Sequence, residues 1–317
     1  MALLCISYFI SIGACLSVVG LLIEYALPTS APRRWLWCGV IVVAAFLPPV
    51  LAARHSSSVM TLWGYEIAKL PADKTAVSHQ GVYHNLLDCN APYGSTFNWM
   101  WVVSLGALFA WGLANTWRVS RISRGERNTI VDGIPVILTD SVGPATIGVW
   151  RSRVVVPQWV LALPGVQRQY VVRHEEEHRA AHDARLLCAA SILVCLFPWN
   201  LPLWWQLHRL RLAVEMDCDN RVVSALGNAH SYGELLFKVA EASSRGPRLQ
   251  PAFIGAGMLE RRLNALLSPS PRRIIKRLLA PALAIALLAV MISVPHPMRE
   301  GSLAGHSMKD HVGMAKN

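Results

Sequence analysis

Four long apolar stretches constrain the fold of this chain most strongly, because each is long enough to cross a lipid bilayer as a helix. They cover residues 1–23, 35–53, 97–117 and 278–294. A spanning helix needs about 20 apolar residues. Only 15% of this chain is charged, against about 25% in ordinary soluble domains. The sequence therefore predicts a mainly α-helical integral membrane protein with four transmembrane helices.

The distribution of basic residues predicts the orientation of these spans. Residues 118–277 are rich in arginine and begin directly after the third stretch, whereas the charges of residues 54–96 are balanced. Because Lys and Arg accumulate on the cytoplasmic side of a membrane, we expect both termini to lie outside. This orientation accounts for the net charge of +11, so we expect no direct nucleic-acid partner. The first stretch lacks a basic n-region and is too long for a signal peptide, which favours a retained helix.

Residues 186–207 are apolar enough to span, yet arginine-rich segments flank them on both sides, and Pro198, Asn200 and Pro202 interrupt them. A helical hairpin that enters the bilayer and returns to the same side reconciles these facts. Its turn must be shallow or packed against other helices, because exposed non-helical backbone is not tolerated in lipid.

The chain then divides into four parts. We expect a three-span membrane region at 1–117 with an extracytoplasmic loop at 54–96, a cytoplasmic domain at 118–277 that includes the hairpin 186–207, a last transmembrane helix at 278–295, and a short extracytoplasmic tail at 296–317.

Short β-like runs precede the most polar part of the cytoplasmic domain. They cover residues 134–138, 145–150 and 153–156, and the last two flank Arg151-Ser152 as a hairpin would. Together with the helices, they predict a small α+β domain. An edge strand there could align an extended peptide by strand addition.

Residues 174–178 read His-Glu-Glu-Glu-His, an HExxH pattern. Two histidines four residues apart lie on one face of a helix and can share one zinc ion. Glu175 is then placed to act as general base toward a water that the zinc activates. The seven cysteines form no CxxC pair, so a cysteine zinc cluster is not predicted.

A catalytic zinc site usually has three protein ligands, and Glu215 is the best candidate for the third. It begins an ExxxD pattern that places Asp219 on the same helical face. Asp219 could then accept a hydrogen bond from a ligand histidine and fix its tautomer. Asp183 follows the first pattern by just over one turn and could act similarly, although a solvated polar residue is as good an interpretation.

An oxyanion donor cannot be chosen from sequence. Tyr232 and His208 are weak candidates, beside His182 and His230. His182 extends the histidine stripe at i+4 spacing, but three histidines of one helix on one zinc give poor geometry, so we expect it to be peripheral.

These residues resemble the BlaR/MecR-type signal-transducing membrane metallopeptidases. The resemblance rests on His174 to His178, on the hairpin segment 197–204, on Glu215 to Asp219, and on residues 144–157 before the zinc helix. It implies three spans, a cytoplasmic zincin-like domain and a final span in a bacterial-type inner membrane. It also implies one Zn²⁺ and site-specific cleavage of a cytoplasmic transcriptional repressor, of the protein itself, or of both.

In the antibiotic-sensing members of that family, a penicillin-binding domain follows the last span. Residues 295–317 are too few for such a folded sensor, so we expect any signal to enter through the loop 54–96, the tail or a partner. A homo-oligomer and a role for β-lactams both stay open. Two other functions are kept: an HtpX-like quality-control protease, which shares HExxH, a hairpin and ExxxD, and a catalytically silent membrane adaptor.

Overall fold

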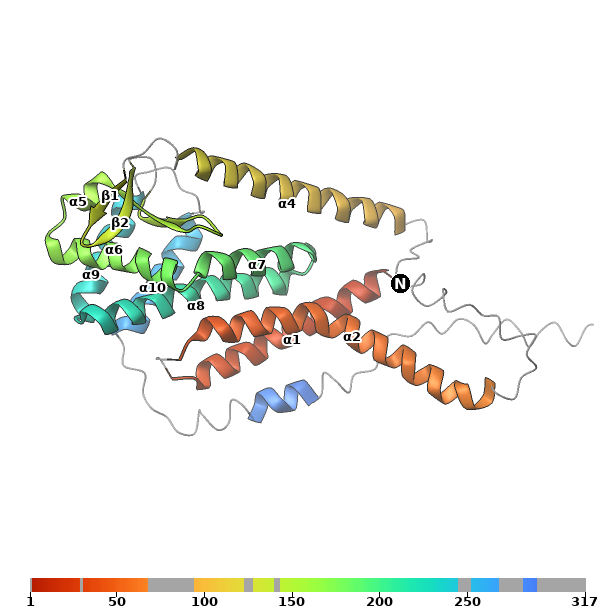
Figure 1. The fold of residues 1–317 in the computed structure, drawn as a ribbon. Helices are drawn as coiled ribbons and strands as arrows, with labels where there is room; N and C mark the ends of the chain where they lie inside the picture. Colours follow the sequence, from red (N-terminus) through yellow and green to blue (C-terminus); the bar gives the residue numbers. More distant parts are fainter. Residues whose placement is uncertain are drawn as a thin grey trace, which may run out of the picture.

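The computed structural model describes residues 2–28, 31–67, 94–122, 128–139, 143–244, 252–267 and 282–289. This part of the chain is mostly helical, with one small sheet (Figure 1). Its helices are α1 (Ala2–Ala26), α2 (Arg33–Ile67), α4 (Gly94–Ile122), α5 (Gln158–Leu161), α6 (Gly165–Ala180), α7 (Asp183–Cys195), α8 (Leu201–Leu226), α9 (Ala229–Ser244) and α10 (Ala252–Leu267).

Two segments are long and apolar enough to cross a membrane, namely Ile6–Ala26 in α1 and Arg33–Val50 in α2. Helix α4 carries a shorter apolar segment, Trp101–Ala114, and residues 282–289 of the fourth predicted span are helical. The two N-terminal spans are therefore supported by length and composition. A total of four spans, and their topology, stay predictions.

Helix α2 is longer than the sequence predicts. It passes through Pro48 and Pro49 and continues to Ile67, where a loop is expected from residue 54. A proline removes one backbone hydrogen bond and bends a helix without having to end it, and Figure 1 shows α2 changing direction along its length. Residues 68–93 of the predicted loop and the tail 296–317 lie outside the described residues.

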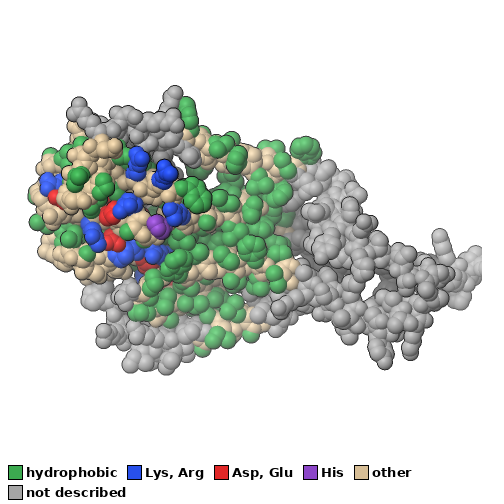
Figure 2. Space-filling view, in the orientation of Figure 1, with side chains coloured by type: hydrophobic (Ala, Val, Ile, Leu, Met, Phe, Trp, Pro, Cys, Tyr) green, Lys and Arg blue, Asp and Glu red, His purple; other side chains and the backbone are tan. Residues whose placement is uncertain are grey.

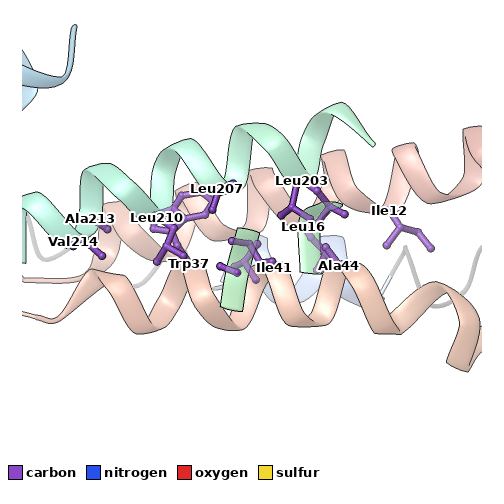
Figure 3. Packing of buried hydrophobic residues seen from close by; sticks show 13 residues of the cluster. Ile12, Leu16, Trp37, Ile41, Ala44, Leu203, Leu207, Leu210, Ala213 and Val214 are labelled. Atoms are coloured by element: carbon purple, nitrogen blue, oxygen red, sulfur yellow. The ribbon is translucent and has the colours of Figure 1, made fainter. Parts of the chain in front are cut away.

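Helices α7 and α8 form a helical hairpin at the predicted position and pack against α1 and α2 (Figure 1). The four helices share one apolar core, shown from close by in Figure 3. Its fully buried members include Trp37, Ile41, Leu203, Leu207 and Leu210. The hairpin therefore belongs to the same bundle as the two N-terminal helices.

The turn of the hairpin is covered by helix α1. Asn200 is fully buried there, and its side-chain amide donates to the Phe9 carbonyl at 3.5 Å. Further along α8, the buried Gln206 amide donates to the Gly13 carbonyl at 3.0 Å and to the Ser17 hydroxyl at 2.9 Å. Protein thus covers the Asn200 end of the non-helical turn, as an apolar environment requires.

We expect Gly13→Leu to weaken the docking of α1 on the hairpin. A Cβ at Gly13 would lie 3.0 Å from the Pro202 Cβ and 3.1 Å from the Asn200 side-chain oxygen, and overpacking of this kind costs about 1–3 kcal/mol. The thermal unfolding midpoint of the detergent-solubilised chain should fall. Gly39→Leu is the matched control, because a Cβ there meets nothing within 4 Å. Equal midpoints for both variants would contradict this packing.

The sheet has four strands in the order β1-β2-β4-β3. They are β1 (Asn128–Val131), β2 (Ile134–Thr139), β3 (Ala145–Ile147) and β4 (Arg153–Pro157). β2 and β4 are parallel, whereas β1–β2 and β3–β4 are antiparallel. The second and third β-like runs of the sequence therefore pair as predicted, and β3 is an edge strand.

A second core joins this sheet to α6, the C-terminal half of α8, α9 and α10. It contains Val154, Val172, Val222 and Leu235. Helix α8 belongs to both cores. Its first half packs with α1, α2 and α7 in the first core, and these four helices are called the membrane bundle. Its second half packs in the second core with the sheet, α6, α9 and α10, which together are called the sheet domain. Figure 2 shows the corresponding division of the surface, with apolar side chains over the bundle and charged ones gathered over the sheet domain. Glu215 lies on α8 where the two cores meet.

Candidate metal centre and active site

Helix α6 carries the HExxH residues into the interior of the sheet domain. Its residues Tyr170, Val171 and Val172 are buried in the second core, which fixes the rotation of the helix. His174, Glu175 and His178 then line a cavity of about 300 Å³. Glu215, Tyr232 and Arg262 line the same cavity, together with the apolar residues Leu235, Leu236, Val239, Met258 and Leu259 of α9 and α10.

Three side chains converge on one point in this cavity. His174 Nε2 and His178 Nε2 lie 3.2 Å apart. The Glu215 carboxylate oxygens lie 3.5 Å from His174 Nε2 and 3.7 Å from His178 Nε2. Donors bound at about 2.1 Å to one tetrahedral ion lie about 3.4 Å apart. The two imidazoles and the carboxylate therefore fit a zinc-sized ion, in the arrangement that the sequence predicts.

Cys218 offers a second set of donors that the sequence did not indicate. With His174 and His178 it forms a group whose ligand atoms all lie within 4.8 Å of one another. However, its sulfur lies 3.3 Å from Nδ1 of His174, behind the ring, and 3.3 Å from the His174 carbonyl oxygen. The Nε2 atoms of both histidines face Glu215 instead, so Glu215 fits an ion shared by the two rings better than Cys218, whose sulfur lies on the Nδ1 side of His174.

Neighbouring charges shift the pKa values of the candidate metal donors. Burial raises the pKa of Glu215, but Arg262 and the two histidines outweigh it and hold that pKa well below its usual range. Burial lowers the pKa of His174, yet the Cys218 sulfur and the Glu215 carboxylate raise it to about 10. Without a metal, the His174 ring is therefore protonated at neutral pH.

Zinc affinity should consequently rise with pH. A histidine must be neutral to bind a metal, so binding displaces at least one proton from this site as long as the pH lies below the raised pKa of about 10 for His174. Because the pKa of His178 is also raised and each displaced proton adds about tenfold per pH unit, the apparent affinity should rise by at least about tenfold per unit between pH 6 and pH 8. Chelator competition at several pH values measures this slope. An affinity that does not change over this range would contradict the protonated metal-free site.

The back of the His174 ring is held by a polar cluster. The Tyr232 hydroxyl lies 2.9 Å from His174 Nδ1 and donates to Asp219 at 2.8 Å. Arg262 donates two hydrogen bonds to Asp219, at 2.7 and 2.8 Å, and its Nη1 lies 3.0 Å from Glu215. Burial, then the charge of Asp219, raises the pKa of Tyr232, so it stays a neutral phenol. Tyr232 is thus placed to orient the His174 ring. Its hydroxyl already contacts His174 Nδ1 and Asp219.

His178 is oriented from the other side by Asp183. His178 Nδ1 lies 2.8 Å from one Asp183 oxygen, and Asp183 is buried. His182 sits in the left-handed region with φ of 55°, which turns the chain sharply from α6 into α7 and brings Asp183 back beside the ring. This pair leaves Nε2 of His178 available for the metal. The structure thus brings Asp183 into the site at the position where the sequence allowed two interpretations.

Glu175 lines the cavity with the two histidines and contacts edge strand β3. The Thr146 hydroxyl donates to the Glu175 backbone carbonyl at 2.6 Å and lies 3.2 Å from one oxygen of its carboxylate. Glu175 is 7% exposed. The edge of the sheet is therefore fixed next to the predicted general base.

Three other histidines lie outside the cavity lining. His208 is on α8, seven residues before Glu215, which is about 10 Å along a helix. His182 is exposed at the turn into α7. His230 is exposed and lies 3.4 Å from Glu234. Sequence reasoning missed Arg262, Cys218 and Thr146, although the ExxxD pattern could have prompted a search for a cation paired with its aspartate.

A helix with two metal-donor histidines, an intervening glutamate and a third donor on α8, joined to two apolar N-terminal helices, defines a membrane-associated protein of the metallopeptidase type. The model of one protein family matches this chain over residues 1–266 of 317, and its description is BlaR1 peptidase M56. The chain belongs to this family, and the membership implies peptidase activity. No curated protein and no solved structure matches the chain.

Proposed function

We propose that this protein is a membrane-embedded zinc endopeptidase that acts in signal transduction. The convergence of His174 Nε2, His178 Nε2 and the Glu215 carboxylate beside Glu175 carries the proposal. The family membership supports the peptidase activity.

The chemistry of the chain's own residues fits peptide hydrolysis. A zinc ion held by these donors would supply a Lewis acid for the scissile carbonyl and would make nearby water more acidic. Glu175 accepts the proton of the attacking water and delivers it to the leaving amine. The Thr146 hydroxyl lies 3.2 Å from one oxygen of that carboxylate and donates to the Glu175 backbone carbonyl at 2.6 Å, which ties strand β3 to this part of α6.

The substrate is expected to bind as an extended peptide along β3. An edge strand offers unpaired backbone groups for strand addition, and β3 lies directly beside α6. The cavity beyond the metal position is walled by leucines, Val239 and Met258, so it suits an apolar substrate side chain.

A cytoplasmic transcriptional repressor, the protein itself, or both are the proposed substrates. The orientation that the basic residues predict puts this cavity on the cytoplasmic side. General quality control of membrane proteins is the second candidate, because the HExxH, hairpin and ExxxD features serve it equally well.

Co-expression with candidate repressors from neighbouring genes tests the proposal. We expect one or two defined fragments of a single repressor, lost when the cells are treated with a zinc chelator and restored by added zinc. Degradation of many unfolded membrane proteins with no preferred fragment would instead indicate quality control. Intact substrates under all conditions would contradict the proposed activity.

A further inference from the structure

The N-terminal end of helix α2 is attached to the metal site by two independent contacts. The backbone N–H groups of Arg33 and Arg34, the first two of the helix, donate to the two carboxylate oxygens of Asp217 at 3.1 and 3.0 Å. An acidic side chain that accepts these unpaired donors stabilises a helix start. Asp217 lies on α8, two residues after Glu215.

The second contact comes from the Arg34 side chain and reaches Asp183, the partner of His178. Arg34 Nη1 donates to Asp183 Oδ1 at 2.7 Å, and the other oxygen of Asp183 lies 2.8 Å from Nδ1 of His178. The side chain of Asp183 is 3% exposed and that of Arg34 is 15% exposed. Arg221 is the other cation near this carboxylate, at 3.5 Å, and it also pairs with Glu177. Arg34 therefore makes the shorter of the two contacts.

From this geometry we propose that Arg34 is a positioning residue for His178. Through Arg34, the N-terminal end of span α2 supports the metal site. The inference rests on the metal site proposed above. Arg34 holds Asp183 in the orientation that fixes the His178 ring and directs Nε2 toward the cavity. A displacement of α2 relative to α6 would consequently act on His178 through Asp183, which couples the membrane bundle to the metal site.

Arg34→Gln in the full-length chain, with zinc affinity measured by chelator competition, tests the proposal. Loss of a hydrogen-bond partner outside the ligands typically weakens metal binding about 10–100-fold, and we expect a loss of about tenfold. Arg33→Gln is the matched control, because it removes the same charge one residue earlier and leaves both backbone bonds to Asp217 intact. The Arg33 side chain lies instead 3.9 Å from the Met216 sulfur, so this variant should stay within twofold of wild type.

Two further variants separate positioning from folding. Arg34→Lys keeps a cation that can make the single bond to Asp183 and should recover most of the affinity. In an Asp183→Asn background, Arg34→Gln should have little further effect, because the two residues act through one contact. Equal zinc affinities for Arg34→Gln and Arg33→Gln, or no recovery with lysine, would overturn the proposal. A wild-type chain that binds zinc with this pattern but cleaves nothing would contradict only the proposed protease function.

Discussion

Glu175→Gln is expected to reduce cleavage about a thousand-fold while the protein keeps its metal. General acid–base catalysis by a positioned side chain contributes about 10²–10⁴-fold, and an amide can neither accept nor deliver the proton. The change preserves the shape of the side chain and its contact with the Thr146 hydroxyl. The measurement is the rate of fragment appearance from the repressor, together with the zinc content of the purified protein.

Glu176→Gln is the control for this variant. Glu176 is the next residue on the same helix and pairs with Arg179 at 2.6 Å. It lies outside the cavity lining. We expect wild-type cleavage from it. Full cleavage by Glu175→Gln would remove the general base from the mechanism, and loss of zinc in the same variant would mean that Glu175 is itself a ligand.

Glu215→Gln should weaken zinc binding by more than about a hundredfold, beyond the usual effect of losing an outer hydrogen-bond partner. The variant replaces a charged ligand by a neutral amide. Its Arg262 partner keeps two hydrogen bonds to Asp219, so the polar cluster behind His174 should persist. Unfolding midpoints measured without metal check that the fold survives.

Cys218→Ser separates the two donor sets of this site. If Glu215 is the third ligand, the serine variant should bind zinc within about tenfold of wild type, because only a contact behind the His174 ring is changed. The opposite order, with a large loss for Cys218→Ser and a small one for Glu215→Gln, would assign the metal to the cysteine set.

Local periodicity was enough to predict two pairs of neighbouring side chains in and beside this cavity. Four-residue spacing on a helix places His174 beside His178, and the same spacing places Glu215 near Asp219. The hairpin followed from apolar length combined with proline and asparagine at its centre. These features depend on near neighbours in the chain, and the sequence displays near neighbours directly.

The supporting contacts could not be predicted in the same way. Arg34 and Asp183 are 149 residues apart, and Arg262 and Asp219 are 43 apart. No periodicity connects such residues, because their meeting depends on how α2 packs against α7 and how α10 packs against α8. Strand β1, in contrast, could have been predicted from the sequence. The Asp132-Gly133 pair between β1 and β2 is a recognised hairpin signal, and both residues have positive φ.

X-ray absorption at the zinc edge of the purified, zinc-loaded protein distinguishes the Glu215 donor set from the Cys218 donor set. Bonds from zinc to histidine nitrogen or carboxylate oxygen are about 2.0–2.2 Å long, whereas bonds to cysteine sulfur are about 2.3 Å long. We expect only nitrogen and oxygen bound to the zinc, from His174, His178, Glu215 and solvent. A sulfur shell, or the absence of stoichiometric zinc, would contradict it.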